Sequence, residues 1–127
     1  MQLLDTDVLI DLLRGFPPAR AWLGALPDAP GMPGLAVLEL LQGCRNLQEA
    51  RRVEQLATIF QIFWPTHSDC NRALTSFARL HLAAGIGLLD VLIGECAAGL
   101  GADLCTFNAR HFQAMANVMT SQPYLRP

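Results

Sequence analysis

The sequence contains no lysine, and all nine of its basic residues are arginines. This absence excludes P-loop NTPases, whose loop lysine binds the nucleotide phosphates. It also excludes response-regulator receivers, which need an active-site lysine. The formal net charge is −2, so the chain has no overall positive field for attracting nucleic acid. Any binding of RNA or DNA must therefore come from local groups of arginines.

Charged residues of either sign are scarce. They make up 16% of the chain, against a usual share of about 25%, while 52% of the residues are hydrophobic. So few charged side chains would leave part of the surface of a monomer apolar. We therefore expect a second copy or another partner to cover part of the surface, with an uncharged polar surface as the alternative.

The chain also lacks a metal-binding cysteine pair and a long apolar run. Its four cysteines show no C-x-x-C spacing, which favours reduced, buried thiols. The N-terminus has acids where a signal peptide needs basic residues. The longest nearly apolar run, 82–94, is interrupted by Asp90 and is shorter than the about 20 residues of a membrane span. We expect a cytoplasmic protein with no membrane association.

Apolar stretches with strand character alternate with stretches of helical periodicity. This alternation predicts one α/β domain over residues 1–127, with a short, mainly parallel sheet flanked by helices on both faces. Strands are expected at 2–4, 61–64, 103–106 and 118–120, with a very short one near Met32. Helices are expected at 6–14, from 17 onward, and at 35–42, 47–60, 88–99 and 109–115. A long helix capped by Ser68 or Asp69 should run to about residue 84.

Three acids, Asp5, Glu39 and Asp90, lie in apolar runs, where a carboxylate is costly to bury. Singly, Asp5 or Asp90 could cap a helix, and Glu39 could pair with an arginine. If the acids converge, each pair repels by roughly 4 kcal/mol at about 4 Å. A bound cation would remove that repulsion, and oxygen ligands select Mg²⁺ or Mn²⁺. Such a site points to phosphoryl or phosphodiester chemistry.

The remaining acids near these positions receive other interpretations. Asp7 lies in the first turn of a helix, where an acid favours the helix dipole, with contact to a metal through water as the alternative. Asp11 is expected to be solvated or paired with an arginine. Glu95 is rotated by about 140° from Asp90 on the same helix, which predicts a surface charge.

Three segments together resemble the PIN-domain nucleases: "LLDTDVLID", "LELLQG" and "GLLDVLIGECAAGLGADLCTFNARHF". The toxin subgroup of bacterial type II toxin–antitoxin pairs, called VapC-like, looks closest. The resemblance implies a PIN-like fold and a Mg²⁺- or Mn²⁺-dependent endoribonuclease that hydrolyses RNA phosphodiester bonds with metal-activated water. It also implies a homodimer and a small cognate antitoxin.

By position in these motifs, Asp5, Glu39 and Asp90 match the acidic metal ligands of the family. Asn108 falls where the family has a fourth Asp or Asn, and Thr106 matches a hydroxyl that helps hold the site. Two features depart from the pattern. The stretch "PGMPGLAVLE" lacks the Ser or Thr that often begins the helix carrying the Glu, and Asn108 removes one formal charge.

Other residues near the motifs have weaker signals. Arg79 and Arg110 could contact RNA phosphates, although a solvated surface arginine is the alternative for either. His111 is expected to be structural or to face the substrate rather than to bind metal. Trp22 and Trp64 could stack on a base, but tryptophans are more often part of a core.

Two other functions fit part of the same sequence pattern. "DTDVL" also resembles the D-x-D motif of haloacid-dehalogenase-type phosphatases, but these enzymes need a lysine to steady the phosphoaspartate. A catalytically inactive PIN-like module that binds RNA or protein remains the alternative. A metal titration would separate it from a nuclease.

Overall fold

A five-stranded parallel sheet forms the centre of the molecule in a computed structural model, which describes residues 1–126. The strand order is β3-β2-β1-β4-β5, and every neighbouring pair is parallel. The sheet is short because each strand has three residues: β1 Gln2–Leu4, β2 Gly31–Pro33, β3 Gln61–Phe63, β4 Asp103–Cys105 and β5 Met119–Ser121. The predicted α/β class with a mainly parallel sheet is confirmed.

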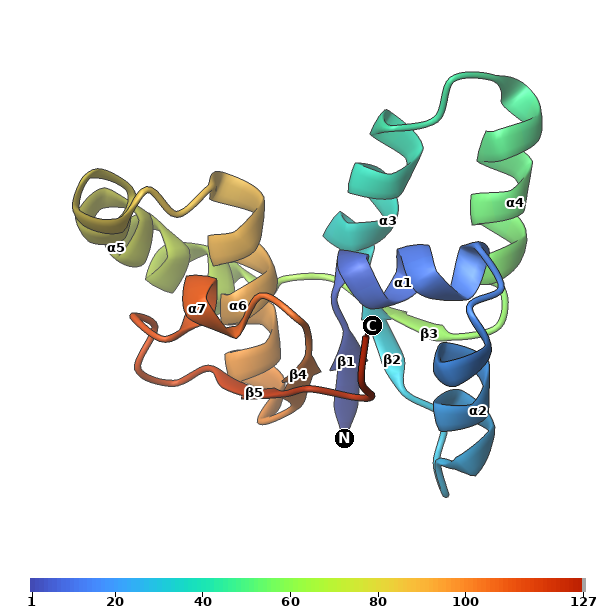
Figure 1. The fold of residues 1–127 in the computed structure, drawn as a ribbon. Coiled ribbons are helices and arrows are strands. Elements are labelled where there is room, and N and C mark those ends of the chain that lie inside the picture. The colour runs from blue at the N-terminus through green and yellow to red at the C-terminus, as the bar shows by residue number, and fades with distance from the viewer. Residues whose placement is uncertain (127) are drawn as a thin grey trace.

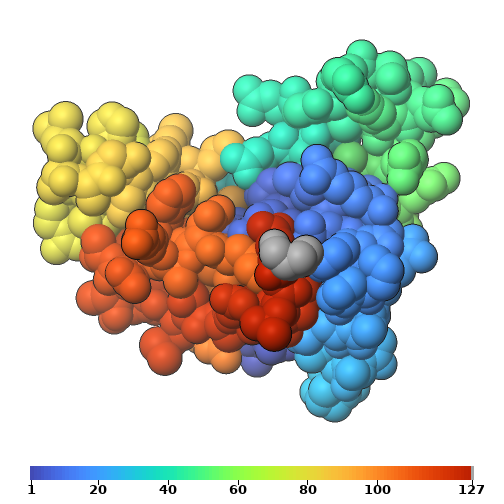
Figure 2. Space-filling model, viewed as in Figure 1, coloured from blue at the N-terminus to red at the C-terminus, as the bar shows by residue number. Residues whose placement is uncertain are grey.

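Seven helices connect and flank the strands. They are α1 Thr6–Leu13, α2 Pro17–Ala25, α3 Gly34–Gln42, α4 Leu47–Ala57, α5 His67–Ala84, α6 Leu88–Leu100 and α7 Ala109–Phe112. Figure 1 shows α1 to α4 grouped on one side of the sheet and α5 to α7 on the other. In Figure 2 the red C-terminal segment lies against the blue N-terminal part of the chain.

The central position of β1 explains where a site can form. From β1 the chain moves outward through β2 and β3, and then returns to the other side of β1 as β4. In open parallel sheets, ligands bind beyond the carboxyl ends of the strands where the order reverses. Here that point lies just after β1 and β4, at Asp5 and Thr106.

Several predicted boundaries need correction at the helix ends. Thr66, not Ser68 or Asp69, is the N-cap of α5: its hydroxyl accepts the Asp69 backbone N–H, and the Asp69 carboxylate accepts the Thr66 backbone N–H. This capping box places Asp69 inside the first turn. Helix α4 ends at Ala57 rather than 60, and α7 ends at Phe112 rather than 115.

The core contains side chains from the sheet and from the helix faces that cover it. Fully buried members include Leu3, Leu4, Leu9, Met32, Val91, Ile93 and Leu104. Trp22 packs partly buried against this core, as expected, whereas Trp64 is exposed. The ring of Trp64 lies over Gly34, where a Cβ would collide with it. Trp64 therefore covers the first turn of α3 instead of joining the core.

Glu95 was predicted to be a surface charge, and that prediction was wrong. It is buried, with 5% of its surface exposed, because its face of α6 packs against α5 rather than against solvent. Arg72 of α5 donates to the Glu95 carboxylate at 3.2 Å and to Asp69 at 2.5 Å. One arginine thus neutralises two buried acids between these helices.

The cysteines and the helix lengths test the expectations of buried thiols and of no membrane-spanning segment. All four cysteines are free, and Cys96 and Cys105 are buried as predicted. Cys44 is half-buried, and Cys70 is exposed, contrary to the expectation of buried thiols. Within residues 1–126, no helix combines the length and the apolar character needed to cross a bilayer.

Candidate active site

Asp5 lies at the junction of β1 and α1 and is held by groups from both ends of the chain. Its Oδ1 accepts the Thr6 backbone N–H at 2.8 Å, which caps α1. Its Oδ2 accepts the hydroxyl of Thr106 at 2.7 Å, and Thr106 follows the neighbouring strand β4. Asp5 can therefore cap α1 and still line the candidate site. Burial, reinforced by the nearby charge of Asp7, raises the pKa of Asp5 to about 6.

Asp7 orders the loop that follows β4. One carboxylate oxygen accepts the Val8 backbone N–H, and the other accepts the Phe107 backbone N–H at 2.8 Å. Burial raises the pKa of Asp7, and the hydrogen bond from Phe107 opposes that shift. Asp7 therefore fixes the segment that carries Thr106 and Asn108, a role that its place in the first helical turn did not reveal.

Glu39 extends from α3 toward the start of α1. Its Oε1 accepts the Thr6 hydroxyl at 2.5 Å. Helix α3 begins after Pro33 without a capping side chain, which agrees with the missing hydroxyl noted in the sequence. Thr6, between Asp5 and Asp7, provides a hydroxyl to Glu39 from another helix. Sequence reasoning missed this contact, because the two residues are 33 positions apart.

Asp90 lies in the first turn of α6 and faces α7. Its Oδ2 is 3.2 Å from Nδ1 of His111, and the carboxylate is partly exposed. Asn108 immediately precedes α7, and its backbone N–H donates to the Thr106 hydroxyl at 3.0 Å. Thr106 therefore joins the position of Asn108 to that of Asp5.

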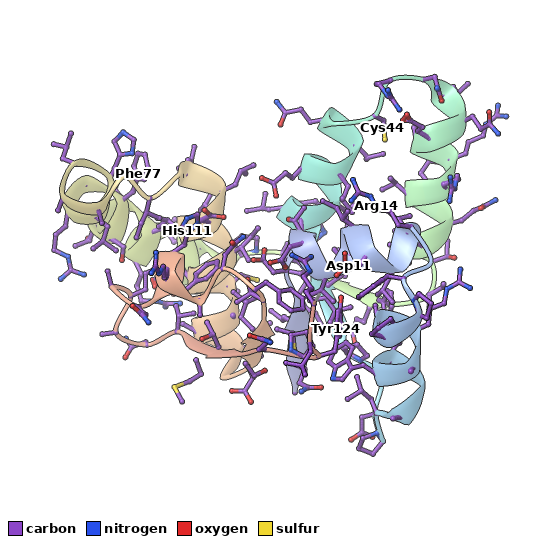
Figure 3. The ribbon with its side chains drawn as sticks, viewed as in Figure 1. Asp11, Arg14, Cys44, Phe77, His111 and Tyr124 are labelled. Atoms are coloured by element: carbon purple, nitrogen blue, oxygen red, sulfur yellow. The ribbon has the colours of Figure 1, made fainter. Side chains whose placement is uncertain are left out.

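One pocket of about 920 Å³ brings the predicted residues together. Asp5, Asp7, Glu39, Asp90 and Asn108 all line it, and His111 joins them from α7. The pocket continues along α1 toward Arg14 and the start of α4. Figure 3 shows His111 on α7 at one side and Arg14 on α1 at the other.

Comparison with known proteins identifies the family. The family model described as PIN domain matches residues 3–118. The chain belongs to the PIN-domain family. It is 36% identical over 117 residues to Ribonuclease VapC10 of Mycobacterium tuberculosis, covering 88% of this chain and 86% of that protein. Ribonuclease VapC19 of the same organism is 34% identical over 119 residues, covering 88% and 92%.

Solved structures agree with this PIN-domain assignment. The VapBC-1 structure from nontypeable Haemophilus influenzae superposes with a TM-score of 0.76 at 26% identity, covering 95% of this chain and 96% of that chain. The DNA-bound VapBC structure from Salmonella typhimurium gives a TM-score of 0.80 at 19% identity, covering 94% and 96%. The second similarity shows the fold alone.

The oxygen donors of this PIN domain suit a hard divalent cation. The residues that line the pocket include the carboxylates of Asp5, Glu39 and Asp90 and the amide of Asn108, and Mg²⁺ and Mn²⁺ prefer such oxygen ligands. Within residues 1–126, however, no three His, Cys, Asp or Glu side chains form a group that could hold an ion as placed. The side chains share a pocket without the tight convergence that the sequence suggested, and Glu39 and Asp90 contact Thr6 and His111 instead. The donor chemistry fits a metal, and closing around one requires movement of these side chains.

The RNA contacts considered for Arg79 and Arg110 stay a prediction. Arg79 on α5 and Arg110 on α7 are exposed, and neither is among the residues that line the pocket. Arg14, Arg45 and Arg52 line it instead. Asp11 pairs with Arg126 at 3.0 Å and accepts the Tyr124 hydroxyl at 2.7 Å, in line with the expectation of an arginine partner.

Replacing Thr106 by Val is expected to destabilise the PIN domain by about 1–3 kcal/mol, because a buried carboxylate oxygen of Asp5 loses its donor. The Asn108 backbone N–H loses its acceptor in the same change. Thermal denaturation would measure the loss. Thr106→Ser keeps the hydroxyl and serves as the control. Equal melting temperatures for the Val and Ser variants would show that the hydroxyl does not stabilise Asp5.

Proposed function

We propose that this protein is a Mg²⁺- or Mn²⁺-dependent endoribonuclease and the toxin of a toxin–antitoxin pair. The observation that carries the proposal is the pocket at the carboxyl ends of β1 and β4, lined by Asp5, Glu39, Asp90 and Asn108. Two relatives at 34% and 36% identity are named ribonucleases, which supports the same chemistry.

In this proposal Asp5, Glu39 and Asp90 hold the cation, and Asn108 provides a fourth oxygen. When bound, the cation supplies an activated water and stabilises the charge that develops on the phosphoryl oxygens. The carboxylates themselves must be charged to bind it. Burial opposes that charge at Asp5, and the hydrogen bond from Thr106 favours it.

The other polar residues act by fixing the ligands. Thr106 orients Asp5, and Asp7 holds the backbone at Phe107. Asp5 therefore loses less freedom when a metal binds. Glu39 and Asp90 must turn from Thr6 and His111 to reach the same ion. His111 lies against Asp90 and faces the pocket, where it can meet RNA.

A protein partner belongs to the same proposal. The similar structures include a toxin–antitoxin complex from Klebsiella pneumoniae and the VapBC complexes. We propose a small antitoxin for this chain, homodimerisation, and action in the cytoplasm. Exposed apolar side chains support a covered surface: Leu38, Trp64, Leu74, Leu82 and Leu88 are each at least half exposed.

The metal dependence of RNA cleavage tests the proposed activity. Purified protein incubated with single-stranded RNA is expected to cleave it when Mg²⁺ or Mn²⁺ is present, and to stop when EDTA is in excess. Denaturing gel electrophoresis of end-labelled RNA would show the products. The inactive-module alternative predicts RNA binding without cleavage at any metal concentration. Cleavage that continues in EDTA would contradict the metal-dependent mechanism.

A further inference from the structure

The pocket has a second end, where three arginines lie together with one acid, Glu49. Arg14 closes α1, Arg45 lies in the loop just before α4, and Arg52 lies in the middle of α4; all three line the same pocket. From Asp5 to Arg14 the chain advances nine residues along α1, or roughly 13 Å at about 1.5 Å a residue. The three candidate metal ligands and Arg14 thus lie apart along one pocket, and the acid at the arginine end, Glu49, is paired with Arg45.

Arg52 is held beside Arg14 by a specific contact. Its Nη2 donates to the backbone carbonyl of Leu13 at 3.1 Å, so a cation of α4 reaches the carbonyl end of α1. This bond uses one of the five N–H donors of the guanidinium. The other donors of Arg52 remain for a ligand, and Arg14, the residue after Leu13, lines the same pocket.

No acid neutralises this pair. Among residues 1–126, the ion pairs of the arginines involve Arg45, Arg72 and Arg126, and none involves Arg14 or Arg52. Arg45 is already paired with Glu49 and is highly exposed, so it contributes less positive charge. Two guanidiniums that line one pocket without an ion-pair partner favour an anion, and a planar guanidinium suits phosphate oxygens.

We infer that Arg14 and Arg52 bind the sugar-phosphate backbone of the RNA strand whose cleaved phosphate lies at the acidic end of the pocket. This inference rests on the proposed nuclease activity and assigns the path of its substrate. The negative charges of Asp5, Glu39 and Asp90 repel the phosphates of an RNA strand that enters the pocket. Arg14 and Arg52, about 13 Å along the pocket, attract those phosphates and offset part of the repulsion. Contacts to phosphate would position the strand without selecting its sequence.

The binding test uses the Asp90→Asn variant with Mg²⁺ and a fluorescein-labelled single-stranded RNA of about twelve nucleotides. Fluorescence anisotropy at several salt concentrations gives the affinity and its salt dependence. Adding Arg14→Gln, or Arg14→Gln with Arg52→Gln, is expected to weaken binding by about tenfold and about a hundredfold. The slope of log affinity against log salt should fall by about 0.7 for each phosphate contact removed.

Matched variants separate phosphate binding from a structural effect. Arg51→Gln removes the same charge from the neighbouring position of α4, outside the pocket, and is expected to leave affinity and slope unchanged. Arg14→Lys keeps the charge and is expected to retain most of the slope. Arg14 makes no side-chain contact like that of Arg52 among the described residues, so Arg14→Gln should also melt within about 2 °C of its parent.

Kinetics of the otherwise unchanged protein give a second measurement. Arg14→Gln is expected to raise KM by about tenfold and to leave kcat within about twofold, since the contact lies away from the reacting phosphate. If the wild type cleaves RNA but these variants match Arg51→Gln in KM, affinity and salt slope, the inference is overturned and the nuclease proposal stands. Absence of cleavage by the wild type would overturn both.

Discussion

Asp90→Asn is expected to slow RNA cleavage by about 10²–10³-fold, because it removes one charged ligand of the proposed metal. The substitution keeps the shape of the side chain and eliminates one of the carboxylates in the pocket. In EDTA the variant is therefore expected to melt no lower than the wild type, and higher if repulsion among the acids dominates. Loss of activity without loss of stability would identify Asp90 as part of the reaction centre.

Melting in the presence of metal measures the same role without RNA. With free Mg²⁺ or Mn²⁺ at about ten times the dissociation constant, binding should stabilise the wild type by about 1.4 kcal/mol, or roughly 3–6 °C. The Asp90→Asn variant should lose most of that shift. Asp103→Asn is the control, since Asp103 is an exposed acid of β4 outside the pocket. An equal metal shift in Asp90→Asn and wild type would remove Asp90 from the ligand set.

Arg72→Met is expected to cause the largest loss of stability, about 3 kcal/mol, with a fall in melting temperature of roughly 10 °C. The methionine can fill the space of the arginine stem, but Asp69 and Glu95 would then be buried without a cation. The side chains of these two acids are only 5% and 7% exposed, so water cannot replace the lost donor fully. Thermal or urea denaturation would measure the effect.

Two further variants test whether the unpaired acids cause that loss of stability. Arg79→Met changes an exposed arginine of the same helix and should melt within about 2 °C of the wild type. Adding Glu95→Gln to Arg72→Met removes one of the stranded charges and should recover part of the stability. If Arg72→Met melts like Arg79→Met, the arginine between α5 and α6 does not offset the buried acids.

The elements of the fold were predictable where local signals agreed. Strand β1 and helix α1 followed from an apolar run that ends in an aspartate, and Gly85 marked the end of α5. Strand β2 near Met32 was weaker, because its neighbours are prolines and glycines. Glu95 was misplaced because helical periodicity gives the angle between two side chains and not the identity of the helix that covers each face.

The candidate site was predictable in its residue types more than in its contacts. A carboxylate within an apolar run is costly, which drew attention to Asp5, Glu39 and Asp90. The hydroxyl of Thr6 on Glu39 depends on how α1 and α3 pack, and the arginines of the pocket depend on the position of α4. Such contacts depend on tertiary packing, so the sequence alone does not single out Arg14 and Arg52 as residues that line the pocket.

The hydrogen bond from Thr106 to Asp5 joins residues that are 101 positions apart. During synthesis such a contact cannot form until the second residue has left the ribosome. β4 and Thr106 complete the proposed metal site and lie near the C-terminal end of the chain. We therefore expect the growing chain to be unable to cleave RNA until most of it has been translated. Incomplete products of translation that stop before this strand should be harmless to the ribosomes and messages around them.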